Sequence, residues 1–468
     1  MRLHDVAAAI AAGELSPVDH ICDVLGRLEA DRLGLAITMD AEDARWQAEV
    51  LAGELAAGYS RGPLHGVTVG VKDMIDVAGL PTRCGSAVLA DAPPAAADAA
   101  IVAALRQAGA VVVAKLHTHE FAYGPTGDVA ATGPAHNPHD PTRITGGSSS
   151  GSAAAVAAGY LPLAIGTDTG CSIRTPAALC GVVGLKPALG ALPTQGVFPL
   201  SDTCDHVGLI AADALSVALA CGVLAPDDRQ LGVVPRHPAT LGRTPTAIMA
   251  GERGDGGRPV VGVATGAYWV PHDPVIAAAV LAAAASLSRV ATVVEVDTPD
   301  IGELAATYAP IVGSEAYATH THWLAERPGD YQPATAERMR TFADLPAAEY
   351  VAAQRTRRRL ATELWEHLRV AGVDVLLTPT TPLRATPIGA RKVDVGAAQV
   401  SVVPALLSLT QPFNLTGWPA VSVPGVVTDG GLPAGVQLVG VGVGEAELLR
   451  LAALVHQPVP GTVTAGPA

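Results

Sequence analysis

A helix that passes through one glycine into a strand constrains the fold more than any other feature of this sequence. In DAAIVAALRQAGAVVVAKLHTHEF (98–121), apolar residues recur at helical spacing before Gly109, and a valine-rich strand pattern follows it. The earlier stretch HGVTVGVKD (65–73) alternates valine with small or polar residues, which predicts another strand. Helices that alternate with strands are typical of an α/β protein.

The same style continues through both halves of the chain. Ser152–Gly159 has the alanine-rich composition of a helix that ends at a glycine, and Asp273–Leu287 has it again. We therefore expect one large domain over residues 1–468. Residues 225–257, rich in Pro, Gly, Arg and Asp, are expected to form a connecting excursion, after which about 258–460 completes the domain.

Composition and charge narrow the class of protein. Hydrophobic residues make up 49% of the 468 residues, enough for a large core, which excludes a disordered chain. The 30 Lys and Arg against 44 Asp and Glu give a net charge of −14, which would repel a phosphate backbone. The most basic stretch, RTRRR (355–359), lies in a helical pattern and is interpreted as a solvated helix face. We expect no nucleic-acid partner.

Cysteine spacing and hydropathy favour neither a metal site nor a membrane protein. The six cysteines contain no CxxC pair, so we expect neither a bound metal nor a disulfide framework. No apolar run reaches the length of a membrane span, and Asp5 and Glu14 flank the short apolar patch at the N-terminus. These features predict a cytoplasmic protein with reduced thiols and no membrane contact.

Lys72 stands at the end of a predicted strand, among small residues. Alternate side chains point to opposite faces of a strand, so Lys72 shares a face with Thr68 and Gly70, and Asp73 points away. A lysine that is desolvated and separated from its neighbouring carboxylate can lose its proton near neutral pH and act as a base. An ordinary surface lysine is the alternative that this strand alone leaves open.

A stretch rich in glycine and serine, TGGSSSGS (145–152), leads into the alanine-rich helix. It has the composition of a linker, but its glycines also allow the backbone to approach other groups closely. An anion cradle at a helix N-terminus, or a loop that carries a catalytic hydroxyl on Ser148, are the other interpretations. The P-loop lysine is missing, and the nucleophile-elbow match at Ser149 lacks the strand that should precede it.

A further serine, Ser172, lies in the turn GTDTGCSIR (166–174) that follows a predicted strand. Successive backbone N–H groups from Thr169 to Ser172 can converge on one point and form an oxyanion hole. Asp168 and Arg174 flank this turn and can brace it as an ion pair. A structural serine in a glycine-rich turn is the alternative.

Taken together, these stretches resemble the amidase signature family. PLHGVTVGVKDMIDVAGLPTRCGS (63–86) is similar to the lysine segment of that family, and NPHDPTRITGGSSSGSAAAVAAGYLPLAIGTDTGCSIRTPAALCGVVGLKP (137–187) to its signature. QPFNLTGWPAVSVP (411–424) and GLPAGVQLVG (431–440) are similar to its C-terminal segments. The resemblance covers nearly the whole chain and implies a large mixed β-sheet covered by α-helices, with the signature core at about 60–215.

The resemblance also implies roles for individual residues. By motif position Ser172 is the nucleophile, Ser148 is a bridging serine held by a cis peptide bond, and Lys72 is the base. The implied oxyanion hole consists of the backbone N–H groups of Thr169, Gly170 and Cys171. The positions that support this site in the family are Ser149, Thr167, Asp168 and Arg174. No metal or other cofactor is implied.

Three positions depart from the pattern of the family. Cys171 stands where a glycine is usual, which predicts a narrower acyl pocket or a reaction with thiol reagents. Leu209 and Ala212 stand where a proline and an arginine are more usual, which affects packing more than chemistry.

The expected activity is hydrolysis of a linear carboxamide through an acyl-enzyme, with release of a carboxylate and ammonia or an amine. The alternative is the A subunit of a tRNA-dependent amidotransferase, which needs partner subunits; HTHEFAYG (117–124) differs from the form associated with that protein. The expected partner is a small-molecule amide, and a homodimer is left open. Candidate substrate contacts near the motifs are Met74, Tyr123, Cys171 and Trp418.

Overall fold

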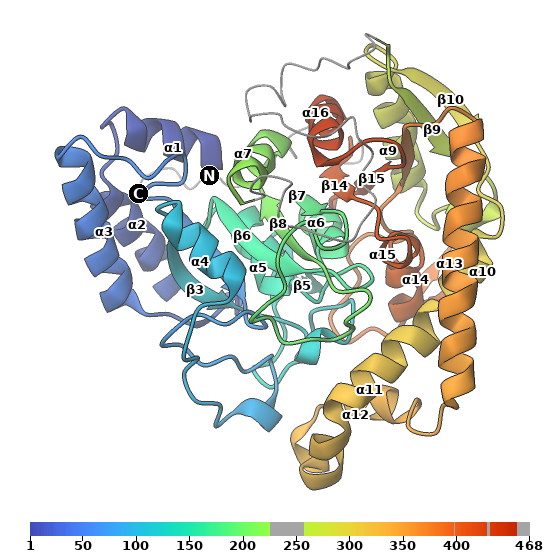
Figure 1. Cartoon of the computed structure of the whole chain (residues 1–468), viewed down its shortest axis with the longest axis horizontal. Coiled ribbons are helices and arrows are strands. Elements are labelled where there is room, and N and C mark those ends of the chain that lie inside the picture. Colours follow the sequence, from blue (N-terminus) through green and yellow to red (C-terminus); the bar gives the residue numbers. More distant parts are fainter. Residues whose placement is uncertain (225–256, 397, 428–430, 456–468) are drawn as a thin grey trace.

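The centre of the protein is a mixed sheet of eleven strands (Figure 1). A computed structural model describes residues 1–224, 257–396, 398–427 and 431–455. Across the sheet the strands are β1 (Ala36–Thr38), β3 (Val111–Leu116), β2 (Thr68–Lys72), β6 (Leu163–Thr167), β8 (Val207–Ala211), β7 (Val183–Lys186), β14 (Ala420–Pro424), β15 (Gly435–Gly440), β11 (Val375–Pro379), β9 (Val260–Ala264) and β10 (Thr292–Val296). Two short hairpins lie outside it, β4 (His136–Asn137) with β5 (Asp140–Ile144), and β12 (Lys392–Val395) with β13 (Ala398–Ser401).

Helices cover the sheet. The helices of the N-terminal half are α1 (Leu3–Ala11), α2 (Pro17–Glu29), α3 (Ala41–Ala56), α4 (Ala100–Gln107), α5 (Ser150–Ala157), α6 (Arg174–Cys180) and α7 (Ala214–Leu224). Those of the C-terminal half are α9 (Pro274–Leu287), α10 (Ile301–Ala306), α11 (Tyr308–Glu326), α12 (Pro333–Arg340), α13 (Ala347–Val370), α14 (Val402–Ser408), α15 (Pro412–Leu415) and α16 (Glu445–Val455). Short 3-10 turns occur at η1 (Ala87–Leu89), η2 (Glu120–Ala122), η4 (Ala267–Trp269) and η5 (Pro328–Asp330).

Strand directions make the sheet mixed. β2 runs parallel to both β3 and β6, whereas the strands from β8 to β15 pair in antiparallel fashion. At the far side β11, β9 and β10 are parallel to one another. The expected α/β fold with a large mixed sheet covered by helices is confirmed, and the ends of β2 and β6 lie side by side.

Alternate strand residues face separate cores, as the pleat of a sheet requires. Val69 and Val71 of β2 pack in a core with residues of α1, α4, α7, α9 and α16. Val111 and Val113 of β3 pack in a second core with residues of α2, α3, α5 and α6. A third core joins α10, α11, α12 and α13 to the C-terminal strands, and these helices lie at the opposite end of the sheet from α1 to α4 in Figure 1.

Helix α5 is buried because its residues are small. A side chain at Gly151 would come within 2.5 Å of the His117 backbone nitrogen and 2.6 Å of the Leu35 carbonyl oxygen. The alanines that follow are buried in the second core. The serine-rich stretch is therefore not a linker, because its last residues form the first turn of a buried helix.

The structure corrects the expectation for residues 355–359, and it describes almost none of residues 225–257. The RTRRR stretch is not wholly a solvated face, because Arg357 is buried and donates hydrogen bonds to the carbonyls of Thr203 and Leu415. The expected excursion at 225–257 lies almost wholly outside the described residues.

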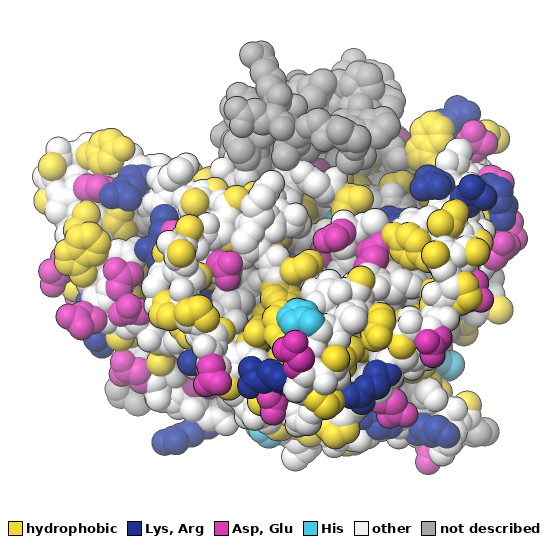
Figure 2. Space-filling model, turned by 60° about the horizontal axis from the view of Figure 1, so that its bottom comes forward, with side chains coloured by type: hydrophobic (Ala, Val, Ile, Leu, Met, Phe, Trp, Pro, Cys, Tyr) yellow, Lys and Arg dark blue, Asp and Glu magenta, His cyan; other side chains and the backbone are white. Residues whose placement is uncertain are grey.

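Figure 2 shows Lys and Arg side chains interspersed with Asp and Glu on the face that it displays. None of the helices in the described ranges has the length and hydropathy needed to cross a membrane.

Candidate active site

The end of β2 brings Lys72 against the turn that opens α5. Lys72 is fully buried, and its Nζ lies 2.6 Å from Ser148 Oγ and 2.7 Å from Thr167 Oγ1. Both partners are neutral hydroxyls, and Lys72 forms no ion pair with a carboxylate of the described residues. Asp73, the next residue, points to the other side and pairs with Lys115 at 2.9 Å.

This environment changes the protonation of Lys72. Burial lowers the pKa of Lys72 to about 7, because an ammonium group loses its hydration there, and the nearby carboxylates of Asp205 and Asp168 only partly oppose this effect. At neutral pH a substantial fraction of the amine is unprotonated. Such an amine can donate to one hydroxyl and accept a proton from the other.

The serine-rich turn places two of its serines in the site. The Gly147–Ser148 peptide bond is cis, and Ser148 is fully buried. Ser149 Oγ donates to the Thr167 carbonyl at 3.1 Å and accepts from the Thr167 N–H at 3.2 Å, which ties the start of α5 to the end of β6. The Ser149 N–H donates to the Ser172 carbonyl at 3.1 Å, so the two serine-bearing turns are joined.

The turn after β6 carries Ser172 and presents free donors. Among the described residues, no acceptor pairs with the backbone N–H groups of residues 169–172. The following N–H groups, of Ile173 and Arg174, instead donate to Asp168 Oδ2 at 3.1 and 3.4 Å. Consecutive unpaired N–H groups in one buried turn form a concavity suited to an anion. A side chain at Gly170 would collide with the Tyr308 hydroxyl, so this close approach requires glycine.

A buried ion pair holds the turn in shape. The Arg174 guanidinium contacts both carboxylate oxygens of Asp168, at 2.9 and 3.0 Å, and both side chains are fully buried. Asn414 Nδ2 donates to Asp168 Oδ1 at 2.9 Å, and Gln437 Oε1 accepts from Arg174 at 2.7 Å. Burial by itself would raise the pKa of Asp168, but Arg174 and these hydrogen bonds hold it below its ordinary value.

Three contributors to the site are missed by sequence reasoning. Asn414 and Gln437 lie in the C-terminal segments similar to the family, and a polar residue inside each apolar stretch is the signal that could have found them. Asp205 carries no comparable signal. It accepts from Thr169 Oγ1 at 2.6 Å and from the N–H groups of Leu200 and Ser201, and burial raises the pKa of Asp205 to about 6.

Cys171 lies beside the proposed nucleophile. Its thiol is buried, lies 3.6 Å from the Gly147 carbonyl oxygen, and has a pKa that burial raises to about 12. Burial and the raised pKa both disfavour the thiolate, which is the reactive form of a cysteine. Met74 is buried and packs in the third core.

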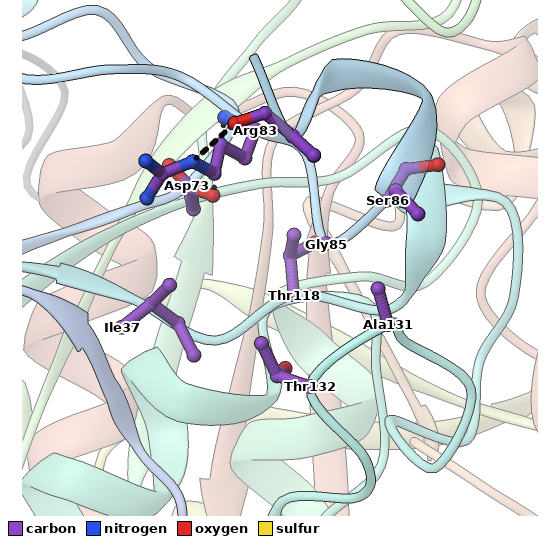
Figure 3. Close-up of a pocket in the computed structure, with 10 residues that line it drawn as sticks. Ile37, Asp73, Arg83, Gly85, Ser86, Thr118, Ala131 and Thr132 are labelled. Atoms are coloured by element: carbon purple, nitrogen blue, oxygen red, sulfur yellow. Dashed lines mark hydrogen bonds between the residues drawn. The ribbon is translucent and has the colours of Figure 1, made fainter. Parts of the chain in front are cut away.

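A cavity of about 220 Å³ lies next to this cluster, and its lining residues include Asp73, Arg83 and Thr118 (Figure 3). The Arg83 N–H donates to Asp73 Oδ2 at 3.3 Å at one end of it. None of Lys72, Ser148 and Ser172 is among its lining residues.

The chain matches the Amidase family over residues 21–449. It belongs to this family. Among its relatives is AtzE of Pseudomonas sp., which belongs to a 1-carboxybiuret hydrolase and is 36% identical over 96% of this chain and 97% of that protein. The A subunit of the Glutamyl-tRNA(Gln) amidotransferase from Symbiobacterium thermophilum is 35% identical over 94% of this chain and 93% of that protein.

Solved structures agree with this assignment. The 6-aminohexanoate cyclic dimer hydrolase is 28% identical, with a TM-score of 0.85 over 99% of this chain and 97% of that one. The proteins similar to this chain thus include a hydrolase whose named substrate is cyclic, and other relatives are named as subunits. Family membership alone does not restrict this chain to linear amides.

Proposed function

We propose that this amidase-family chain hydrolyses a carboxamide C–N bond through an acyl-enzyme formed on Ser172. One observation carries the proposal: the buried amine of Lys72 lies 2.6 Å from Ser148 Oγ with no carboxylate of the described residues paired to it, beside a turn with free N–H donors. A partly unprotonated amine in contact with a serine hydroxyl supplies what a serine nucleophile needs from a base. We also propose that both halves of the chain form one catalytic unit, because a single sheet runs through them.

The proposed reaction starts with a proton relay. Lys72 Nζ accepts the proton of Ser148, Ser148 takes the proton of Ser172, and Ser172 Oγ attacks the amide carbon. The carbonyl electrons move to oxygen, and the N–H groups of Thr169, Gly170 and Cys171 stabilise the resulting oxyanion. The proton then returns through Ser148 to the leaving nitrogen as the C–N bond breaks, and water hydrolyses the ester on Ser172.

The other residues hold this geometry. Ser149 and Thr167 join the two turns, and the Asp168–Arg174 pair fixes the path of the backbone that carries the N–H donors. Among the described residues there is no cluster of His, Cys, Asp or Glu suited to a metal ion. Apart from the substrate and the water that hydrolyses the ester, each proposed step uses side chains and N–H groups of this chain.

A second candidate function is that of an amidotransferase component, which the relative from Symbiobacterium thermophilum favours. Ammonia release by the purified chain alone, over a panel of primary amides that includes glutamine, separates the two functions. Hydrolysis that Ser172→Ala abolishes supports the free-standing amidase. Inertness without partner subunits would instead favour the amidotransferase component.

A further inference from the structure

Arg357 is a buried cation that the proposed mechanism does not use. It lies on the stripe of α13 that also carries Leu360, Leu364 and Leu368, and it is 8% exposed. Among the described residues, no carboxylate forms an ion pair with it. A charged side chain in the row of buried leucines loses its hydration, which is costly unless its N–H groups find strong acceptors.

Backbone carbonyls from two distant segments are the acceptors. Arg357 Nε donates to the Leu415 carbonyl at 2.6 Å, and the two terminal nitrogens donate to the Thr203 carbonyl at 2.9 Å, the Thr203 hydroxyl at 3.1 Å and the Asn414 carbonyl at 3.4 Å. The planar fork of a guanidinium holds several acceptors in fixed directions. We call this side chain and its three carbonyl partners the Arg357 clamp, which fastens residues 200–206 and the short helix α15 to α13.

Helix α15 reaches the turn after β6 through Asn414. The side-chain Nδ2 of Asn414 donates to the Asp168 carbonyl at 2.8 Å and to Asp168 Oδ1 at 2.9 Å. The carbonyl of Leu415, the next residue, lies at the C-terminus of α15, where helix carbonyls lack partners within the helix. Arg357 supplies that partner, and it thereby fixes the backbone from which the Asn414 side chain extends.

Residues 200–206 reach the same turn by a second route. Asp205 Oδ1 accepts from the Thr169 hydroxyl at 2.6 Å, and the Asp168 N–H donates to the His206 carbonyl at 2.8 Å. The His206 N–H donates in return to the Asp168 carbonyl at 3.2 Å. The first two residues of the turn are therefore bonded to a segment that the clamp holds.

Thr203 in this segment is held from two sides. Its hydroxyl donates to Glu315 of α11 at 2.9 Å and accepts from Arg357 of α13 at 3.1 Å, and Glu315 also accepts from the Ser201 hydroxyl at 2.5 Å. Hydrogen bonds to charged groups are stronger than those between neutral groups. The carboxylate and the guanidinium together therefore hold the segment against both helices.

The N–H groups of residues 169–172 depend on such outside support. They have no acceptor among the described residues, so bonds made by other groups of the turn must set the direction in which they point. Donors stabilise a developing oxyanion only when they are already aimed at it, and a misplacement of about 1 Å costs about 10²-fold in rate.

We propose that Arg357 is a positioning residue of the reaction: through Asn414 and Asp205 it fixes the turn whose N–H groups stabilise the oxyanion. The inference rests on the proposed function, because it concerns the turn that carries Ser172. Within the described residues Arg357 forms no hydrogen bond with Ser172, so it acts only through the two segments that it clamps.

Separate values of kcat and KM test this inference. Arg357→Met removes the donors and keeps an apolar stem. With the amide of the panel that the wild type hydrolyses fastest, kcat should fall about 10- to 100-fold and KM should change less than about threefold, because the oxyanion is absent from the bound substrate. Arg357→Lys keeps the charge but cannot span all acceptors, and should lower kcat about 3- to 10-fold. Arg358→Met is the matched control, because Arg358 is exposed on the same helix.

Hydrogen exchange, followed by mass spectrometry, locates the effect without any need for turnover. The peptide 166–174 contains the hydrogen-bonded N–H groups of Asp168, Ile173 and Arg174. We expect this peptide to exchange about tenfold faster in Arg357→Met, and at the wild-type rate in Arg358→Met, whereas helix α2 is unchanged in both. Circular dichroism identifies the folded variants, and Arg357→Lys serves if Arg357→Met does not fold.

Two results separate this inference from the proposed function. Folded Arg357 variants with the kcat of Arg358→Met, with a loss confined to KM, or with exchange that rises in α13 but not in residues 166–174 would overturn the clamp and leave the amidase intact. Faster exchange of residues 166–174 in the Arg357 variants, without ammonia release from any amide by the wild type, would support the clamp and refute the free-standing amidase.

Discussion

Two buried lysines on neighbouring strands show how the partner decides what a lysine does. Lys72 on β2 and Lys115 on β3 are both fully buried. Lys115 lies 2.9 Å from Asp73 Oδ1 and 2.9 Å from Thr82 Oγ1, whereas Lys72 meets only the hydroxyls of Ser148 and Thr167 among the described residues. Because successive side chains point in different directions, the Asp73 carboxylate pairs with Lys115 and not with Lys72. One lysine is thereby held in an ion pair, and the other is free to serve as the proposed base.

The largest effect is expected from Lys72→Met. Loss of the base should lower kcat/KM for amide hydrolysis by about 10²- to 10⁴-fold, the usual contribution of a general base. Methionine matches the apolar length of lysine without its charge, so we expect the fold to survive. Ammonia release and circular dichroism check both points; near wild-type turnover in the folded variant would exclude Lys72 as the base.

Lys115→Met should act on stability instead. It leaves the Asp73 carboxylate buried without its cation, which costs about 3–5 kcal/mol of unfolding free energy. The double variant Lys115→Met/Asp73→Leu removes both charges and should recover most of this loss. Urea unfolding measures the free energies. If Lys115→Met unfolds like the wild type, or if it loses activity per folded molecule as strongly as Lys72→Met, the contrast between the lysines is wrong.

The pH profile should report Lys72. Because the base must be unprotonated and burial brings the pKa of Lys72 to about 7, kcat/KM should fall as pH drops below about 7. The Asp205 carboxylate raises the pKa of Lys72, so Asp205→Asn should move this acid limb to lower pH by less than one unit. Exposed Asp202→Asn is the control. A shift to higher pH in Asp205→Asn would contradict the electrostatic account.

The smallest effect is expected from the threonine hydroxyl at each lysine, Thr167 at Lys72 and Thr82 at Lys115. Thr167→Val removes one hydrogen bond to Lys72, worth about 0.5–1.5 kcal/mol, and should lower kcat/KM roughly two- to tenfold. Thr82→Val removes the matching bond at Lys115 and also the bond that Thr82 donates to Asp76, so it should cost about 1–3 kcal/mol of unfolding free energy, measured in urea. A result in which Thr82→Val reduces activity and Thr167→Val does not would reverse the roles assigned to the two lysines.

Local sequence patterns predict the elements well, because their signals lie in adjacent residues. Ser16 and Pro17 indicate the start of α2, and the Ser16 side chain does accept from the Val18 N–H at 3.1 Å. The order of the strands in the sheet cannot be predicted in this way. β2 lies between β3 and β6, and these pairings join residues that no local pattern brings together. The burial of Arg357 is missed for the same reason: its partners Thr203 and Leu415 are distant in sequence.

The candidate site is predictable in part. The segments of Lys72, Ser148 and Ser172 are indicated by motif and resemblance, and the structure brings Lys72 and Ser148 into contact. The contribution of Asp205 is not predictable, because it depends on residues of separate elements that meet in space: Asp205 accepts from the Thr169 hydroxyl, which lies 36 residues earlier in the chain.

The most direct test of the central claim is to locate the nucleophile by peptide mass spectrometry after reaction with a fluorophosphonate. The account predicts a single adduct on Ser172, formed more slowly in Lys72→Met by about the factor by which that variant loses turnover. An adduct on Ser148 or Cys171, or amide hydrolysis by wild-type enzyme that the reagent neither labels nor inhibits, would contradict it.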